Sequence, residues 1–100
     1  MLILPIKKKW YDMILAGEKK EEYRDIKPYY KSRLENLFPF VGDEQYREKI
    51  CFRNGYSNSS PSFIAECSLR IGTGRTEWGA EQERQYYVLK IHEIIAMDNV

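Results

Sequence analysis

The sequence predicts an α+β domain in which a mixed β-sheet curls into a small barrel. Three observations lead to this prediction. Apolar residues recur with the period of a helix before residue 40, they alternate with period two from residue 48 onward, and 100 residues correspond to one domain, 1–100. A helical region followed by strands that are not adjacent along the chain is typical of α+β folds.

The chain is expected to begin with a short strand and a helix. The segment LILPI, residues 2–6, is apolar and is bounded by a proline and lysines, which predicts a first strand. After it, Trp10, Met13 and Ile14 recur at i, i+3 and i+4, which predicts one buried face of a helix. Gly17 then supplies the left-handed residue that commonly ends a helix.

A second helix is predicted to begin at Pro28 and to end before Pro39, because proline suits a first helical turn but cannot continue a helix. Apolar side chains recur along one side of this segment: Tyr30, Leu34, Leu37 and Phe38. The connection 72–84 has room for one further helical turn. We therefore expect two or three helices beside the sheet.

Three further strands are predicted from alternation, over residues 48–54, 62–71 and 86–95. The second of these has the cleanest pattern, and its core-facing side chains are expected to be Phe63, Ala65, Cys67, Leu69 and Ile71. Residues 54–62 between the first two are rich in turn-forming residues and predict a loop. The strands together form the expected mixed sheet.

The charge is balanced overall but uneven along the chain. The formal net charge is +1, which does not indicate a strongly basic nucleic-acid binder. Through Arg33 there are nine Lys and Arg against five Asp and Glu, whereas the remainder has seven against ten. The first third can therefore present a local positive field, although Lys7, Lys8 and Lys9 are interpreted as a solvated helix face.

The cysteines and the single histidine predict no metal site and no cofactor. Cys51 and Cys67 are far apart and form no CxxC pair, and His92 is the only histidine. Buried thiols of this kind suit a reducing compartment. The apolar start is too short and wrongly flanked for a signal peptide, and no segment approaches the length of a membrane span. A cytoplasmic protein without a membrane partner is therefore expected.

The segment GEKKEEYR, from Gly17 to Arg24, carries charges of alternating sign between two apolar runs. A strand here would place Glu22 and Arg24 on one face, together with Lys20. Burying one of these charges alone would cost several kcal/mol, so a half-buried charged face must be paired or must meet a polar ligand. The alternative is an exposed edge strand whose charges discourage edge-to-edge association.

This segment resembles the G-x-K-x-x-E-x-R signature of the ASCH domain family, which belongs to the PUA-like superfamily. Its setting after a first strand and a first helix is also similar to that family. The resemblance implies a small, open PUA-like β-barrel of mixed strands flanked by helices, with the motif lining a cleft. It further implies that the protein binds RNA or a nucleotide-like ligand, because related domains bind RNA.

The resemblance assigns roles to three residues of the motif. Lys19 and Arg24 would donate to a phosphate or a base carbonyl, lysine as a point charge and arginine as a planar fork. Glu22 would accept from a base amino group or hold one of the two cations in place. Strict alternation puts Lys19 out of phase with the other two, so the strand must begin after Lys19 for all three to converge.

Alternatives to a binding protein remain open. Some small members of the family are amidohydrolases on acylated cytidine, with a threonine nucleophile and a lysine base at motif positions that correspond here to Glu22 and Lys19. Glu22 would then activate water, while Lys19 or Arg24 stabilised an oxyanion, so Lys19 and Glu22 are the candidate catalytic residues. A metal-dependent ribonuclease and a protein-interaction module with a structural salt-bridge cluster are further alternatives. The oligomeric state is not predicted.

A second polar stretch, FRNGYSNSS, follows the strand predicted at 48–54. Its Asn-Gly pair is a turn signal, so a plain loop is one interpretation. The other is that Arg53 and Asn54 point from the strand end into the cleft and that Tyr56 covers a ligand. A base stacked on an aromatic ring gains about 1–3 kcal/mol, and Arg and Asn read base edges or phosphates.

Overall fold

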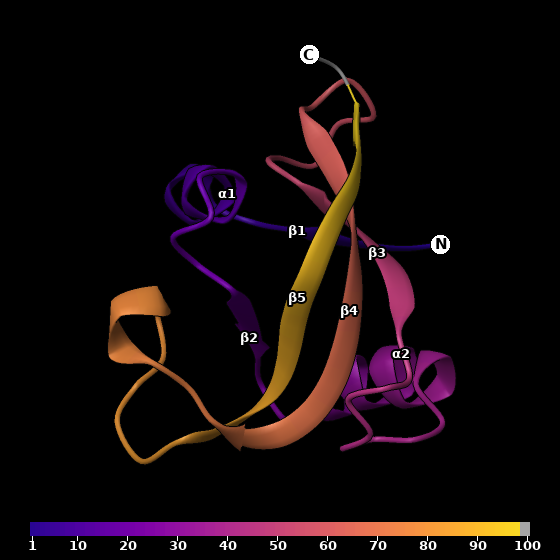
Figure 1. Ribbon diagram of the computed structural model, residues 1–100, viewed down its shortest axis with the longest axis vertical. Coiled ribbons are helices and arrows are strands. Elements are labelled where there is room, and N and C mark those ends of the chain that lie inside the picture. Colours follow the sequence, from indigo (N-terminus) through magenta and orange to yellow (C-terminus); the bar gives the residue numbers. More distant parts are fainter. Residues whose placement is uncertain (99–100) are drawn as a thin grey trace.

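A computed structural model describes residues 1–98 of the chain, with the elements in the order β1, α1, β2, α2, β3, β4, η1 and β5. The bounds are β1 Leu2–Pro5, α1 Lys8–Leu15, β2 Glu21–Arg24, α2 Pro28–Leu37, β3 Glu48–Arg53, β4 Ser62–Thr73, the 3-10 helix η1 Thr76–Trp78 and β5 Gln85–Asp98. Figure 1 shows their arrangement. Within these residues, no helix has the length and apolar content needed to cross a membrane.

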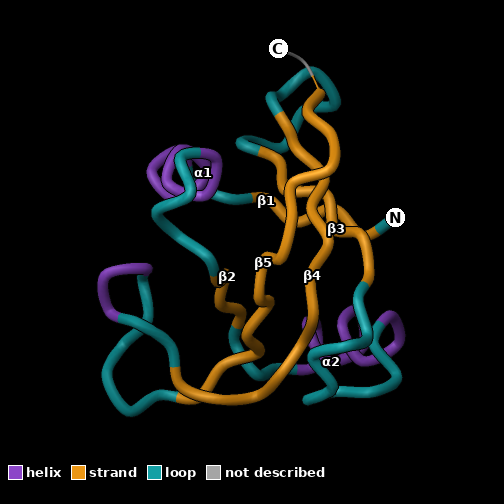
Figure 2. Tube along the Cα trace, viewed as in Figure 1, coloured by secondary structure: helices purple, strands orange, loops and turns teal. Residues whose placement is uncertain are grey.

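The strands of this part of the chain form one five-stranded sheet in the order β1-β3-β4-β5-β2. Strand β1 is parallel to β3 and the other pairs are antiparallel, so the sheet is mixed, as predicted. The long strands β4 and β5 curve strongly (Figure 2), and bulges in their pairing help such bending. The result is a curled half-barrel, which confirms the α+β prediction but leaves β1 and β2 as open edges.

The concave face of the sheet and the helices enclose the hydrophobic core. The inward side chains of β4 are buried as predicted, apart from Ile71, which is exposed near the strand end. In α2 the expected face packs on the core, with Leu34 fully enclosed, as is Phe38 directly after the helix. In α1 the buried face is shifted from the prediction, because Tyr11 is buried beside Ile14, while Met13 is only half-buried.

Gly17 ends α1 in the left-handed region, with φ +79°, as the sequence predicts. The amide of Gly17 donates to the Ile14 oxygen over 3.0 Å, and the amide of Lys19 donates to the Met13 oxygen over 3.1 Å. The chain then leaves the helix and enters β2 at Glu21. Lys19 therefore precedes the strand, which is the condition that lets its side chain meet Glu22 and Arg24.

Candidate functional site

Lys19, Glu22 and Arg24 form a buried charge triad. Lys19 Nζ lies 3.3 Å from Glu22 Oε1, and Arg24 Nη2 lies 2.7 Å from Glu22 Oε2. The three side chains are 1%, 9% and 10% exposed, respectively. Buried charges are tolerated when they are paired and hydrogen-bonded, and one carboxylate here pairs with two cations. The three side chains thus converge, as expected if the strand begins after Lys19.

Lys19 is the deepest member of the triad. Its ammonium donates to the main-chain oxygen of Trp78 and lies 4.8 Å from the centre of a Trp10 ring and 4.9 Å from that of Tyr23. Burial lowers the pKa of Lys19 below its ordinary value, and the Glu22 carboxylate opposes that shift. The buried Lys19 side chain therefore contacts α1, β2 and the β4–β5 connection.

Arg24 joins the triad to the opposite edge of the sheet. Its Nη2 donates to the Pro5 oxygen over 2.7 Å, and its Nη1 donates to the Tyr30 hydroxyl over 3.2 Å. Burial acts to lower the pKa of Arg24, but Glu22 and Tyr30 outweigh it, so the pKa lies above its ordinary value. The Arg24 Nε is buried and has no hydrogen-bond partner among the described residues. One guanidinium thus connects β2, β1 and α2.

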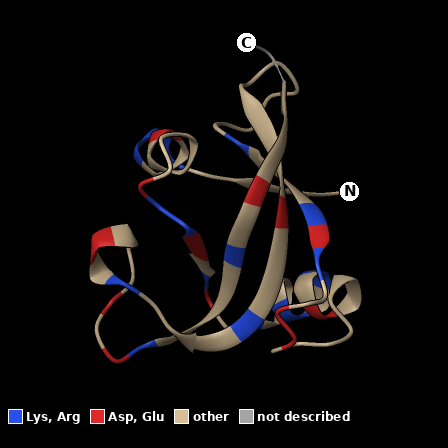
Figure 3. Ribbon diagram, in the orientation of Figure 1, with Lys and Arg blue, Asp and Glu red and all other residues tan. Residues whose placement is uncertain are grey.

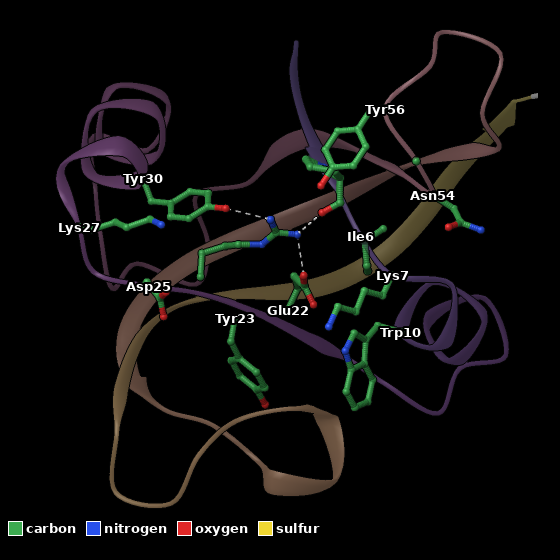
Figure 4. Close-up of a pocket in the computed structure, with 13 residues that line it drawn as sticks. Ile6, Lys7, Trp10, Glu22, Tyr23, Asp25, Lys27, Tyr30, Asn54 and Tyr56 are labelled. Carbon is green, nitrogen blue, oxygen red and sulfur yellow. Dashed lines mark hydrogen bonds and ion pairs between the residues drawn. The ribbon is translucent and has the colours of Figure 1, made fainter.

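An open pocket of about 690 Å³ lies over Arg24, between the edge strands β1 and β2. We name it the seam pocket; Figure 4 shows its side chains. Its walls come from the end of β1, the starts of α1 and α2, β2, and the loop after β3. The lining residues are Pro5, Ile6, Lys7, Trp10, Glu22, Tyr23, Arg24, Asp25, Lys27, Tyr30, Asn54, Gly55 and Tyr56.

Lys7 and Lys27 give the rim of the seam pocket an unneutralised positive charge. They are the N-cap residues of α1 and α2, and neither helix has a side-chain cap or an acidic residue in its first turn within the described chain. Neither lysine has an ion-pair partner among residues 1–98, although acidic and basic residues are interspersed elsewhere (Figure 3). Because helix N-termini are themselves partly positive, this rim is suited to an anion.

The structure brings four of the six predicted ligand residues to the seam pocket: Glu22, Arg24, Asn54 and Tyr56. Tyr56 is 89% exposed, and its hydroxyl end is turned toward the pocket (Figure 4). Lys19 and Arg53 do not line this pocket, contrary to expectation. Lys19 is covered by aromatic rings, and Arg53 lies in β3 beside Pro5, with a buried Nε that has no partner among residues 1–98.

Several residues that line the seam pocket are not predicted from the sequence. Lys7 was interpreted as part of a solvated helix face; it is exposed but also lines the pocket. Trp10, Lys27 and Tyr30 were not predicted to be near the motif. The available signal was the lysine directly before the predicted second helix, where Ser, Thr, Asp or Asn would be the stabilising choice; no such signal marked Lys7.

A second concave region of about 310 Å³, which we name the side pocket, adjoins the seam pocket and shares Trp10, Glu22, Tyr23 and Asp25 with it. The β4–β5 connection, which folds back beside β2 (Figure 1), supplies its other wall. Its remaining lining residues are Trp78, Gly79, Glu81, Arg84 and Tyr86. The backbone amide of Arg75 donates to the Tyr23 hydroxyl over 2.9 Å and fixes this connection against β2.

The chain has no recognisable similarity to the known proteins with which it was compared. No protein-family model, curated protein sequence or solved structure matches this chain. In the described part of the chain, no group of three or more His, Cys, Asp or Glu side chains could hold a metal ion. The features that can recognise a ligand are the rim lysines, the aromatic walls and the triad beneath them.

Proposed function

We propose that the protein binds a nucleotide, either free or as one unit of single-stranded RNA, in the seam pocket. The observation that carries this proposal is the position of Lys7 and Lys27. Each is the N-cap residue of a helix that starts at the rim of the same aromatic-lined pocket. Neither has an acidic partner within residues 1–98. Lysine ammonium groups and helix N-termini are common partners of phosphate oxygens.

The rest of the pocket suits a sugar and a base. Tyr56 offers an exposed ring face and a hydroxyl, and Asn54 offers an amide that can both donate and accept. A base gains about 1–3 kcal/mol by stacking on such a ring. The ring of Tyr30 lies under Lys27 at 5.4 Å, and its hydroxyl already accepts from Arg24. The volume of about 690 Å³ lies within the range of about 300–1,000 Å³ that is usual for small-ligand sites.

The triad supports this pocket from below. Both oxygens of Glu22 are engaged by cations, and both terminal nitrogens of Arg24 already have partners. Lys19 and Glu22 are therefore positioning residues in this proposal, while Arg24 adds positive charge to the pocket floor. The class we propose is an ASCH-type domain of PUA-like fold, which the motif at the open side of a half-barrel supports. A cytoplasmic location is proposed from the sequence alone.

Titration of short single-stranded RNA at rising salt tests the proposal. The logarithm of the association constant should fall by about 0.7 per contacted phosphate for each unit of log salt. Lys7→Gln and Lys27→Gln should each reduce that slope by about 0.7. Matched controls on the same helices are Lys8→Gln and Lys31→Gln, whose lysines pair with Asp12 and Glu35. Absence of binding at low salt would remove the proposal.

A hydrolase acting on a modified nucleoside is the second candidate. The observation that favours it is that burial lowers the pKa of Lys19 beside the Glu22 carboxylate, because shifted pKa values cluster at catalytic sites. This candidate predicts turnover of acylated cytidine, which Glu22→Gln would abolish while the fold is retained. An active Glu22→Gln protein would exclude Glu22 as the base. The metal-dependent ribonuclease alternative stays a prediction.

A further inference from the structure

We infer that the side pocket binds a guanine base, adjacent to the nucleotide in the seam pocket, and that the ligand is therefore a single-stranded oligonucleotide. This inference rests on the proposed function. It adds a second base site, and it assigns that site a preference for one base over the other three.

The two pockets are continuous where Trp10 and Asp25 line both of them. Lys7 and Lys27 line the seam pocket and not the side pocket, so they would contact the phosphate of the nucleotide bound in the seam pocket. Two successive nucleotides would then occupy the two adjoining pockets, with the lysines on the side of the seam pocket.

The side pocket has aromatic walls. Trp10, Tyr23, Trp78 and Tyr86 supply four of its nine lining residues. Sequence-tolerant single-strand binders use such rings as stacking surfaces for bases. Aromatic walls alone would accept any base, so a preference must come from polar groups.

Two carboxylates of the side pocket, those of Asp25 and Glu81, are both paired with Arg84. Arg84 Nη2 lies 2.7 Å from Asp25 Oδ1, and Arg84 Nη1 lies 2.7 Å from Glu81 Oε2. An ionised carboxylate only accepts hydrogen bonds, so these groups select a ligand edge that carries donors. The guanidinium of Arg84 is a group of this kind, because its two terminal donor nitrogens are bonded to the same carbon.

Guanine has the same arrangement of donors on its Watson–Crick edge, where N1–H and the N2 amino group flank one carbon. Adenine and cytosine place a single amino group beside an acceptor nitrogen, and uracil places one N–H between two carbonyls. A carboxylate can therefore make a bidentate contact with guanine and not with the other bases. Bidentate side-chain contacts of this kind discriminate strongly between bases.

Arg84 can yield its place to a base at little cost. The side chains of Arg84, Asp25 and Glu81 are 47%, 45% and 69% exposed, and exposed ion pairs stabilise a protein weakly. In this paired position Arg84 also lies 5.2 Å above the ring of Tyr86, so a base that displaced it would gain that ring face for stacking. Arg84 thus occupies the position that we assign to the guanine edge, although its two nitrogens contact two different carboxylates, one each.

Fluorescence anisotropy with eight-nucleotide RNAs tests the inference. We compare oligouridine with the same RNA carrying one central guanine, adenine or cytosine. The wild type should bind the guanine RNA about tenfold or more tightly than oligouridine, and the adenine and cytosine RNAs should show no such gain. Glu81→Gln and Asp25→Asn should each move that ratio toward one. Glu77→Gln, a nearby exposed carboxylate that does not line the pocket, should retain it.

The outcomes separate the inference from the function on which it rests. A wild-type protein that binds all four RNAs equally would overturn the guanine site and leave the seam pocket as proposed. A guanine preference retained in both Glu81→Gln and Asp25→Asn would overturn the assignment to these carboxylates. Failure to bind any of the RNAs would overturn the proposed function itself.

Discussion

Arg24 in β2 donates a hydrogen bond to the main-chain oxygen of Pro5 in β1, across 2.7 Å. In the described chain these strands are the two edges of the curled sheet, each paired on one side only. The guanidinium therefore connects the open edges where hydrogen bonds between strands are absent. The seam pocket lies directly over this connection, so the side chain that links the two edges also forms the pocket floor.

Arg24→Lys should destabilise the protein, because an ammonium cannot reach Glu22, Pro5 and Tyr30 with the planar fork of a guanidinium. Loss of one charge-assisted hydrogen bond predicts a decrease of about 2 kcal/mol in the unfolding free energy, measured by urea denaturation. Arg33→Lys on the exposed side of α2 is the control and should stay within about 0.5 kcal/mol. Equal effects would show that the bridge across the seam contributes no stability.

Lys19→Met should lower the unfolding free energy by about 3 kcal/mol. Removing one partner of a buried ion pair leaves an incompletely compensated charge, here on Glu22, although Arg24 remains beside it. The adjacent, exposed Lys20 provides a matched control, and Lys20→Met should have little effect. A Lys19→Met protein as stable as the wild type would mean that the triad does not depend on Lys19.

Gly74→Ala should cost about 2 kcal/mol of stability by overpacking. A Cβ at residue 74 would lie 2.4 Å from ring atoms of Tyr23, which is fixed between the two pockets. At Gly72 the nearest atom is the end of the Arg70 side chain, 2.2 Å away, which can move aside. We therefore expect Gly72→Ala to be much milder in thermal unfolding. If the two alanine variants unfold alike, the connection does not pack tightly on Tyr23.

Stability should fall between about pH 10 and pH 12 because of Tyr87. Burial raises the pKa of Tyr87 from 10.0 to about 12, and its hydroxyl donates to Glu35 over 2.5 Å. A raised pKa stabilises the folded state below the unfolded value, and that contribution is lost as the pH rises through the folded value. Tyr87→Phe should show a shallower decline than the wild type in denaturation at stepped pH. Parallel curves would contradict this assignment.

The sequence was informative where a feature depends on neighbours along the chain. The left-handed Gly17 fixes where β2 begins, and the apolar spacing of α2 fixes which side chains meet the core. The alternation of side chains along a strand also predicts that Glu22 and Arg24 lie on the same face of β2. These inferences follow from local geometry, which a short segment largely determines.

Features made by distant segments could not be predicted. Lys19 is enclosed partly because Trp78, 59 residues further along the chain, lies beside it and accepts its hydrogen bond. The pairing of β2 with β5, and the approach of Pro5 to Arg24, depend on sheet order, which periodicity does not specify. Lys7 and Lys27 lie at the rim of the same pocket only because α1 and α2 both start there, and the sequence does not predict that arrangement.

Backbone NMR chemical-shift mapping with a short single-stranded RNA tests the central claim most directly. The account predicts that shifts concentrate at the seam pocket, on the starts of α1 and α2, on β2 and on the loop at Asn54 to Tyr56, and that they weaken in the Lys7→Gln and Lys27→Gln variants. Saturating RNA that leaves these amides unmoved, or that moves a different surface instead, would contradict it.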